Sequence, residues 1–495
     1  MKSKYLLSIL FTVLIGLSTK GQDKQLKLSL EDVIELASSQ SLDAFRNENM
    51  FRASYWEFRY FKADRLPSLS LDATPLDFNR YRNREYNFQT NEEEYVQREY
   101  LNADFGLSLN QNVALTGGRL FLRSELGMVK NLNGDKNNSY QSTPISIGYQ
   151  QELNGYNRLR WEAKIEPLKY EKAKKVFIES RENLSIKATR RFFNLVSAEI
   201  NLSIAENNKA SADTLYKIGQ GRFQVGTVTQ DELLNLQLSQ LRAEQALNTT
   251  KLGLLRAQAE LNSFLGLDKN TKVSCIVPSE IPKLEVKAGE AIAQALDNNP
   301  EILNQQQQLL QEDRQVAEAK SEIGLNTSIY ALYGLDQSAK ELENVYDNPD
   351  RSQRFRLGVN IPIVDWGRRK GRYQMAEYSR EVVKATVRQA RIDFEQDIVQ
   401  TVMEFNLQGD QVRNAALADT VAQKGFEVTF QRFLIGKVDV INLNQARNDL
   451  EQARKDYVLA LNAYWNYYYS IRRLTLYDFA NDEPLTEEYD EILKN

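Results

Sequence analysis

The stretch RFQVGTV, residues 222–228, recurs in altered form 210 residues later as RFLIGKV, residues 432–438. Arginine, phenylalanine, glycine and valine occupy the same places in both copies. Each copy lies between two long segments whose apolar residues have helical spacing. Glycine permits the backbone angles that a tight reversal between two helices needs. The two stretches therefore predict two helix–turn–helix hairpins in one chain.

The duplication extends well beyond the two turns. A shift of 210 residues without any gap aligns residues 148–268 with residues 358–478, and glycine, leucine and aspartate recur at matching places. A repeat without insertions keeps both copies equal in length, so we expect both hairpins to reach the same distance. We expect a first repeat over residues 22–268, a linker over 269–287, a second repeat over 288–478 and a tail over 479–495.

The hairpin helices are expected over residues 160–265 and 369–474, each interrupted only by its turn. A helix of about 60 residues is roughly 90 Å long, far more than a compact core requires. The helix after the first turn carries an apolar stripe with coiled-coil spacing. Its members are Leu233, Leu236, Ala243, Leu247, Leu254, Ala257, Leu261 and Phe264. A second stripe consists of Leu234, Leu238, Leu241, Leu252 and Leu255. Two stripes favour a ring of helices, and an ordinary bundle helix with a wide apolar face is the alternative.

Segments with period two lie between the helices, over residues 68–153 and 326–364. They are expected to form four strands in the first repeat and two in the second, each about as long as a tilted membrane-spanning strand. Long polar connections over residues 77–100, 131–142 and 336–354 resemble surface loops. Short turns on one side and long loops on the other favour an outer-membrane barrel, with a soluble sandwich as the alternative. Six strands leave open edges, so oligomerisation would be needed to close a barrel.

Composition excludes several classes of function. The formal net charge of −4 offers no strong basic field for nucleic acid. The chain has no histidine and one cysteine, Cys275, which alone forms neither an intramolecular disulfide nor a thiolate metal site. We therefore expect no enzyme activity, no metal site and no cofactor. Residues 1–21 read as a secretory signal peptide, with a short membrane anchor as the alternative.

Several motifs in order resemble the TolC-like outer-membrane efflux family. They are the duplicated hairpin unit, the VGT of Val225–Thr227, the GGR of residues 117–119, the N-x-P-I-x-D-x-G pattern from Asn360, and LTLYD at residues 474–478. The resemblance covers about residues 26–478. It implies a mainly α fold with transmembrane β-strands, built from a duplicated helix–strand–long helix–turn–helix repeat.

The resemblance also implies an assembly and a location. Three identical chains would form a helical tunnel in the periplasm that continues into a β-barrel in outer-membrane lipid. The expected partners are a periplasmic adaptor protein and an inner-membrane transporter. The chain would be the passive exit duct of a tripartite efflux or type I secretion system. Family members usually carry four strands per chain, so the sequence leaves open whether four or six enter the barrel.

In this family the turns meet the adaptor. The corresponding residues here are Arg222, Phe223, Val225, Gly226, Thr227, Arg432, Phe433, Ile435, Gly436 and Lys437. The second tip departs from the motif because Lys437 replaces threonine, so the two tips need not bind equivalently. A purely structural role in closing the hairpin is an equal alternative. In that role the arginine side chains would cap helix carbonyls and the phenylalanine rings would pin the turn on neighbouring helices.

Related channels narrow their entrance with acidic side chains after the second turn. The matching positions here are Asn442 and Gln445, with Asp231, Glu232 and Asp439 as nearby carboxylates. Solvated acids that favour a helix start are the alternative reading of these carboxylates. The sequence leaves two alternatives to the duct: a secreted coiled-coil structural protein, and a hydrolase that uses carboxylates. The exported substrate is open among drugs, metal ions and proteins.

Overall fold

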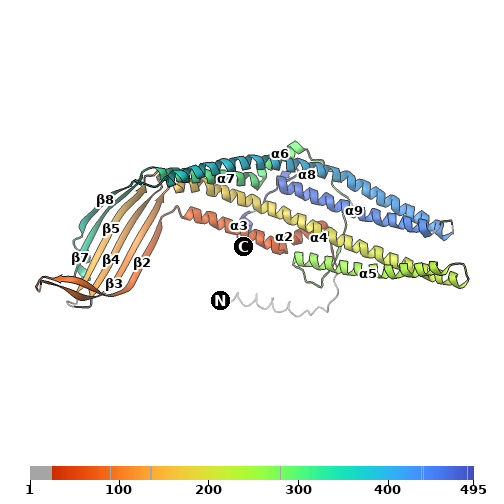
Figure 1. The fold of residues 1–495 in the computed structure, drawn as a ribbon, viewed down its shortest axis with the longest axis horizontal. Coiled ribbons are helices and arrows are strands. Elements are labelled where there is room, and N and C mark those ends of the chain that lie inside the picture. The colour runs from red at the N-terminus through yellow and green to blue at the C-terminus, as the bar shows by residue number, and fades with distance from the viewer. Residues whose placement is uncertain are drawn as a thin grey trace, which may run out of the picture. The chain divides into compact units, whose positions relative to one another are not determined.

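A computed structural model describes residues 25–89, 91–133, 137–278, 280–435, 437–438, 440–487 and 489–494. The expected signal peptide, residues 1–21, lies outside these residues. Long helices and one large sheet dominate the chain (Figure 1). The expected mainly α fold with a β portion is therefore what the structure has.

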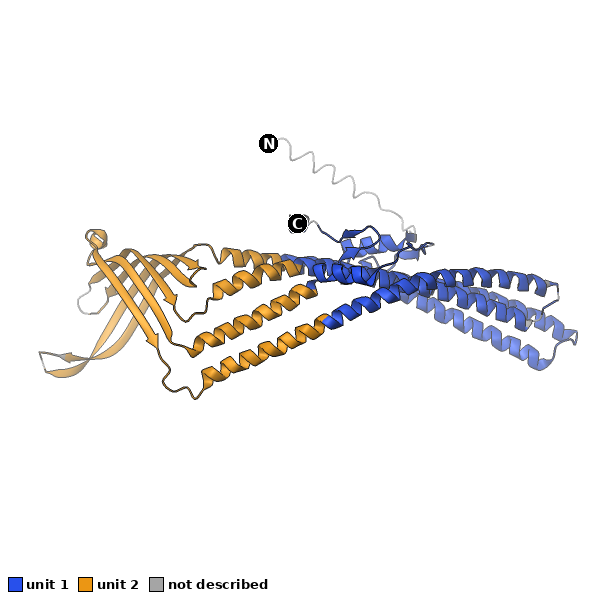
Figure 2. Cartoon of the chain, turned by 90° about the horizontal axis from the view of Figure 1, so that it is seen from above, with its two compact units in different colours: residues 1–52, 174–300, 392–495 blue, residues 53–173, 301–391 orange. Residues whose placement is uncertain are grey.

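The chain forms two compact units, shown in Figure 2. Unit 1 comprises the described parts of residues 1–52, 174–300 and 392–495, and unit 2 comprises residues 53–173 and 301–391. Each unit takes segments from both sequence repeats, so the repeats at 22–268 and 288–478 do not correspond to the compact units. The reason is that the two longest helices, Arg158–Gln224 and Arg368–Leu434, each contribute residues to both units.

The helices of the two hairpins have identical lengths. Helix α4 spans Arg158–Gln224 and α8 spans Arg368–Leu434, each 67 residues long. Helix α5 spans Gln230–Leu265 and α9 spans Val440–Thr475, each 36 residues long. Every bound of the second pair lies 210 residues after its counterpart in the first pair. At 1.5 Å per residue, α4 and α8 are each about 100 Å long.

Shorter elements surround the long helices. They are β1 (Gln25–Leu28), α2 (Leu30–Gln40), α3 (Leu42–Ala63), β6 (Lys272–Cys275), α6 (Ala288–Asn298), α7 (Pro300–Ile323), η1 (Leu342–Tyr346), β9 (Tyr477–Asp478), β10 (Glu483–Pro484) and α10 (Tyr489–Lys494). Helix α2 starts with a capping box: Asp32 N–H donates to Ser29 Oγ at 3.1 Å and Ser29 N–H donates to Asp32 Oδ2 at 2.8 Å. Strands β1 and β6 pair in parallel, which joins the start of the first repeat to the segment after α5.

Unit 1 has a continuous apolar core. Its largest fully buried side chains include Phe192, Phe193, Leu261, Phe405 and Tyr464, which come from four long helices. The small helices α2 and α6 close this core through buried residues spaced three or four apart. The four hairpin helices are therefore held together by aromatic and aliphatic packing.

The first apolar stripe of α5 is the packed one. All eight members of this stripe are half-buried or buried in the single chain. So are Gln240 and Thr250, which fill the two gaps in its 3-4 spacing. The five leucines of the second stripe are between 45% and 61% exposed. The periodicity thus predicted the packed face correctly and identified a second apolar face that the described part of this chain leaves uncovered.

Unit 2 contains a six-stranded antiparallel sheet. Its strands are β2 (Ser68–Asn87), β3 (Glu92–Val113), β4 (Gly118–Asn131), β5 (Asn138–Glu152), β7 (Asn326–Ala339) and β8 (Asp350–Asn360). They lie in the order β2-β3-β4-β5-β7-β8, so β2 and β8 are the two edges. Four strands come from the first repeat and two from the second, as expected.

The prediction of a surface loop over residues 77–100 is wrong. Strands β2 and β3 pair continuously through most of this segment, from Asp77↔Asn102 to Asn87↔Glu92. The residues there are mostly charged, amide-bearing or aromatic on both faces, so no apolar alternation marks them as strands. Cross-strand contacts hold them instead, including two bonds from the Arg98 guanidinium to the Glu85 carboxylate at 2.9 and 2.6 Å.

The other two expected loops are only partly loops. The segment 131–142 runs into β5 at Asn138, and the segment 336–354 contains the end of β7, the short helix η1 and the start of β8. Val345 of η1 is fully buried, and its carbonyl accepts a bond of 2.5 Å from Ser142 Oγ. Local packing against β5 therefore orders a segment whose polar composition resembled a solvated loop.

Candidate functional site: the helix–turn–helix tips and a buried charge cluster

The first tip is closed by backbone hydrogen bonds. Gly226 has φ +72°, a left-handed conformation that a side chain would strain. Its N–H donates to the carbonyl of Phe223 at 3.0 Å, and Thr227 N–H donates to the carbonyl of Arg222 at 2.9 Å. This pair of bonds is the Schellman arrangement that ends many helices. Thr227 Oγ1 also donates to the Arg222 carbonyl at 3.0 Å.

The second tip repeats the backbone bond that spans five residues. Lys437 N–H donates to the carbonyl of Arg432 at 2.9 Å, 210 residues after the equivalent bond. Gly436 and Asp439 lie outside the described residues. Lysine has no hydroxyl, so the extra bond that Thr227 makes in the first tip has no equivalent from this side chain. The two tips therefore share a backbone closure and differ in side-chain chemistry.

The tips present apolar surface. Val225 is 73% exposed, Ile435 is 66% exposed and Phe223 is 42% exposed. Phe223 is partly covered within this chain, and its expected role of pinning the turn on neighbouring helices stays a prediction. The expected capping of helix carbonyls by the Arg222 side chain is unnecessary for closure, because backbone N–H groups and Thr227 already bind the last carbonyls.

The positions considered for a gate lie at the starts of the two return helices. Glu232 Oε2 accepts a bond of 3.0 Å from Thr229 N–H, which caps the first turn of α5. Asn442 and Gln445 are exposed on α9, and Gln445 Nε2 donates to Asp449 Oδ1 at 2.7 Å. The carboxylate of Glu232 therefore stabilises its own helix start, which is the structural role weighed against the gate.

Acid should loosen the start of α5. The Thr229 hydroxyl and nearby backbone N–H groups hold the pKa of Asp231 below its ordinary value of 3.8. A carboxyl with a lowered folded pKa contributes stability above its ordinary pKa and loses it as the pH falls through the folded value. Hydrogen exchange of the α5 N-terminus should stay constant from pH 7 to pH 5 and rise below pH 3.8, after correction for intrinsic rates. Unchanged protection at pH 2.5 would contradict this.

Replacing Gly226 with alanine should destabilise the first tip by about 1–2 kcal/mol, because a Cβ disfavours left-handed backbone. An added Cβ meets nothing within 4 Å, so the effect is conformational and not steric. Gly221, inside α4 and equally open, is the matched control, and Gly221→Ala should be neutral or stabilising. Hydrogen exchange over residues 215–235 should rise only in Gly226→Ala. Equal exchange in the two variants would contradict the proposed closure.

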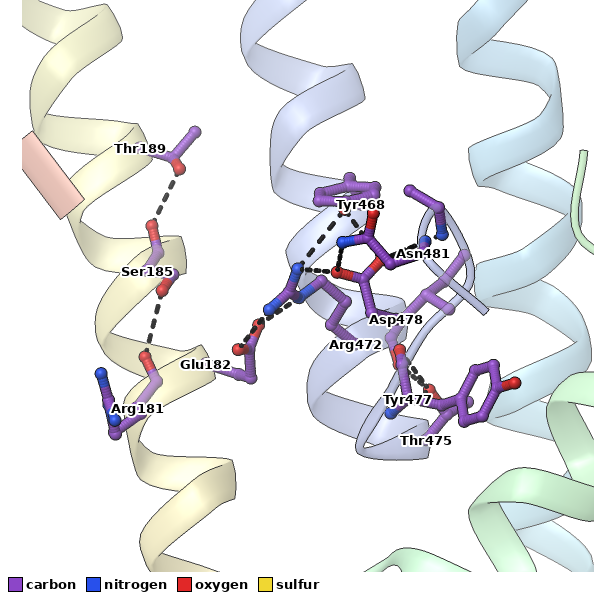
Figure 3. Close-up of polar contacts among 12 residues, drawn as sticks. Arg181, Glu182, Ser185, Thr189, Tyr468, Arg472, Thr475, Tyr477, Asp478 and Asn481 are labelled. Carbon is purple, nitrogen blue, oxygen red and sulfur yellow. Dashed lines mark hydrogen bonds and ion pairs between the residues drawn. The ribbon is translucent and has the colours of Figure 1, made fainter. Parts of the chain in front are cut away.

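A buried charge cluster in unit 1 was not predicted. Arg472 on α9 donates two bonds to the Glu182 carboxylate on α4, from Nε at 2.9 Å and from Nη2 at 3.1 Å (Figure 3). Its Nη1 donates to Asp478 Oδ2 at 2.7 Å. The carboxylate side chains are only 9% and 6% exposed. Burial lowers the pKa of Arg472, but Glu182 more than offsets this, and the pKa lies above its usual range.

Asp478 also organises the segment after α9. Its Oδ1 accepts from Tyr468 OH at 3.3 Å and from Ala480 N–H at 2.9 Å, and its Oδ2 accepts from Asn481 Nδ2 at 3.1 Å. Leu476, with φ +47°, turns the chain so that Asp478 returns toward Arg472. The cluster therefore ties two long helices to the C-terminal segment.

The LTLYD stretch was a partial signal for this cluster because it contains Asp478. The counterpart of Arg472 in the first repeat is Asn262, which is 1% exposed and donates from Nδ2 to the Thr271 carbonyl at 2.8 Å. An amide thus holds the chain reversal in one repeat, while a guanidinium bridging two carboxylates holds it in the other. The repeats are equal in length but different in their polar interior.

Comparisons place the fold among outer-membrane channels. The Campylobacter jejuni CmeC outer membrane channel has a TM-score of 0.66 and 16% identity, covering 94% of this chain and 88% of that one. The outer membrane protein VceC of Vibrio cholerae has a TM-score of 0.60 and 12% identity, covering 92% and 96%. At these identities the likeness shows the fold.

The family profile described as outer membrane efflux protein matches residues 112–267 and 291–475, which is more than half of the chain. The protein belongs to this outer membrane efflux family, and the resemblance to TolC-like proteins is confirmed. It is an outer-membrane protein by this membership.

One curated relative is the cobalt-zinc-cadmium resistance protein CzcC of Cupriavidus metallidurans. It is 27% identical over 121 residues, which are 24% of this chain and 28% of CzcC. The aligned part thus spans little more than a quarter of that relative. Within the described residues, no helix combines the length and apolarity that crossing a membrane requires.

Proposed function

We propose that this protein is the passive outer-membrane exit duct of a tripartite efflux or type I secretion system. Three copies form the duct, and it carries substrate from the periplasm to the exterior without catalysing a reaction or holding a cofactor. The observation that carries the proposal is the open six-stranded sheet, which is apolar on one face and unpaired at β2 and β8.

The two faces of the sheet differ in the way a barrel wall requires. Rows such as Leu69↔Leu109 and Leu71↔Leu107 put exposed leucines on one face. The intervening row Ser70↔Ser108 puts hydroxyls on the other, joined at 2.8 Å. An outward apolar face and a polar interior are the pattern of membrane barrels. This pattern favours lipid on one side of the sheet and water on the other.

The sheet edges set how copies would combine. Neighbouring strands alternate in direction from β2 to β8, so β8 of one copy can pair antiparallel with β2 of the next. Lipid cannot satisfy backbone hydrogen bonds, so a membrane-inserted sheet must close. We infer that all six strands of each chain enter the wall, and that three copies close it by the same head-to-tail contact.

The helical part supports the same assembly. The second stripe of α5 exposes five leucines, and α8 exposes Val382, Leu417, Val421 and Val428. Such apolar surface along helices of this length favours burial by further copies. The ring of hairpins would form the periplasmic tunnel, and all of its tips would reach the same level because both hairpins have equal helix lengths.

The tips are proposed to dock a periplasmic adaptor that connects the duct to an inner-membrane transporter. Val225 and Ile435 supply exposed apolar contacts, and Arg222, Arg432 and Lys437 supply exposed charge. Phe223, Gly226, Thr227, Phe433 and Gly436 complete the proposed docking set. Asp231, Glu232, Asp439, Asn442 and Gln445 are proposed to flank the entrance. A passive duct has no binding step of its own, so the transporter selects the substrate.

Cysteine cross-linking tests the ring closure. In a Cys275→Ser background, one cysteine replaces Ser70 in β2 and a second replaces Ser352, Arg354 or Arg356 in β8. Oxidation in isolated outer membranes should give disulfide-linked dimers and trimers for at least one β8 position. A cysteine at Arg123, which lies on the same inward face in the central strand β4, combined with the same β8 positions, is the control and should give monomers. Monomers with every β2–β8 pair would contradict head-to-tail closure and leave the coiled-coil structural protein as the better reading.

A further inference from the structure

The hairpin of β2 and β3 continues past the rest of the sheet. Strand β4 pairs with β3 only from Tyr100 to Val113, whereas β2 and β3 stay paired up to Asn87↔Glu92. Figure 1 shows this two-stranded ribbon extending beyond the other strands. It lies at the strand ends opposite those that lead into the helices. The ribbon is therefore a two-stranded extension at the far end of the sheet, with no β4 pairing along it.

A β-bulge decides which side chains face outward on this ribbon. The pairing of β2 with β3 shifts between Thr74 and Asp77, so that β2 gains one residue relative to β3. Before the shift, the odd residues of β2 share the face of the outward leucines. After it, the even residues do, because the side-chain period of a strand is two. The extra residue moves the arginines at even positions onto the apolar face.

Three arginines form a column on that face. Arg80, Arg82 and Arg84 alternate along β2 and are all exposed. Alternate residues of a strand are about 6.6 Å apart, so the column spans roughly 13 Å. It begins directly after the row of Phe78 and Leu101, which ends the apolar rows on the same face. In the proposed barrel this is the level at which the lipid tails end and the headgroups begin.

The carboxylates of the ribbon are sorted unevenly between the two faces. Glu85 and Glu94 are opposite each other on the inward face. On the outward face Glu99 pairs with Arg80 Nε at 2.8 Å and Glu93 pairs with Arg84. Gln97, and not an acid, lies opposite Arg82. Arg80 and Arg84 keep side chains that are 62% and 64% exposed, so most of their N–H donors remain accessible.

We propose that this arginine column binds the phosphate groups of a phosphorylated glycolipid in the outer leaflet. Guanidinium groups bind phosphate oxygens through paired N–H donors, and the contact strengthens where water is partly excluded. Cations just beyond an apolar band are placed to meet anionic headgroups. The inference rests on the proposed orientation in the outer membrane and adds a lipid-binding site to it.

Binding of the full-length protein in detergent to purified lipopolysaccharide tests the site. The double variant Arg82→Gln/Arg84→Gln should bind at least tenfold more weakly than the unaltered protein. The matched control Arg354→Gln/Arg356→Gln removes the same charge from the inward face of β8 and should change affinity less than twofold. Dephosphorylated lipopolysaccharide should bind the unaltered protein at least tenfold more weakly, and 10 mM inorganic phosphate should not displace the intact lipid. Equal loss of affinity in the two double variants would overturn the proposal. Equal binding of intact and dephosphorylated lipopolysaccharide by the unaltered protein would also overturn it.

A second variant covers the case in which the first fails to assemble. Glu93→Gln/Glu99→Gln releases the two ion-paired arginines and should tighten binding several-fold, so an unchanged or weaker affinity would count against the site. Light scattering and channel conductance are measured on every variant. Intact conducting trimers that bind intact and dephosphorylated lipopolysaccharide equally would overturn only this inference. Absence of trimers in the unaltered protein would overturn the proposed duct.

Discussion

Replacing Arg472 with alanine is expected to lower the free energy of unfolding of the helical unit by about 3–5 kcal/mol. The change leaves the carboxylates of Glu182 and Asp478 buried without their shared cation. A buried charge that loses its partner costs far more than the pair contributes when intact. Far-UV circular dichroism during chemical denaturation of the detergent-solubilised protein measures the difference.

Arg454 provides the control for this prediction. It also lies on α9 but is 44% exposed and pairs with Asp419 at 3.6 Å. Arg454→Ala should cost less than about 1 kcal/mol, as exposed ion pairs do. Adding Glu182→Gln to Arg472→Ala should recover part of the loss, because the remaining amide carries no charge. A cost below 1 kcal/mol for Arg472→Ala would mean that the cluster does not hold the unit together.

The second large effect is expected at Gly148 in β5. A Cβ there would overlap the ring of Phe121, which is 1% exposed, so the buried ring would have to shift. Gly148→Ala should therefore destabilise the sheet by about 1–3 kcal/mol and reduce the amount of assembled protein. The amount recovered from outer membranes and the temperature of unfolding measure this.

Gly106 in β3 is the matched control because its added Cβ would lie 3.6 Å from Glu125 Cγ, an ordinary contact. Gly106→Ala should leave assembly unchanged. Combining Gly148→Ala with Phe121→Leu should restore part of the loss by removing ring atoms. If Gly148→Ala assembles as well as Gly106→Ala, the close contact between β5 and β4 is not a constraint on the fold.

The helices could be predicted because their signals are local. The stripe from Leu233 to Phe264 follows from spacing alone, and the structure packs every one of its positions. The exact 210-residue repeat of the helix bounds follows from an alignment without gaps. The turn at Gly226 could also be predicted from the sequence, because only a few backbone conformations reverse a helix within this length.

Features that depend on distant partners could not be predicted. Glu182 and Arg472 are 290 residues apart, and the repeat gives no hint because position 392, the equivalent of Glu182, is an isoleucine. The ribbon from Asp77 to Tyr100 was misjudged because its strands are stabilised by charged and aromatic pairs, which do not produce apolar alternation. The compact units combine segments of both repeats, an arrangement that sequence similarity between the repeats does not reveal.

Light scattering on the protein extracted from outer membranes tests the central claim most directly. After subtraction of bound detergent, the account predicts a particle with three times the mass of the mature chain. Three copies are what would close the open edges of β2 and β8 and cover the leucines of α5. A monomer or dimer, or recovery of the protein in the soluble periplasmic fraction, would contradict the duct.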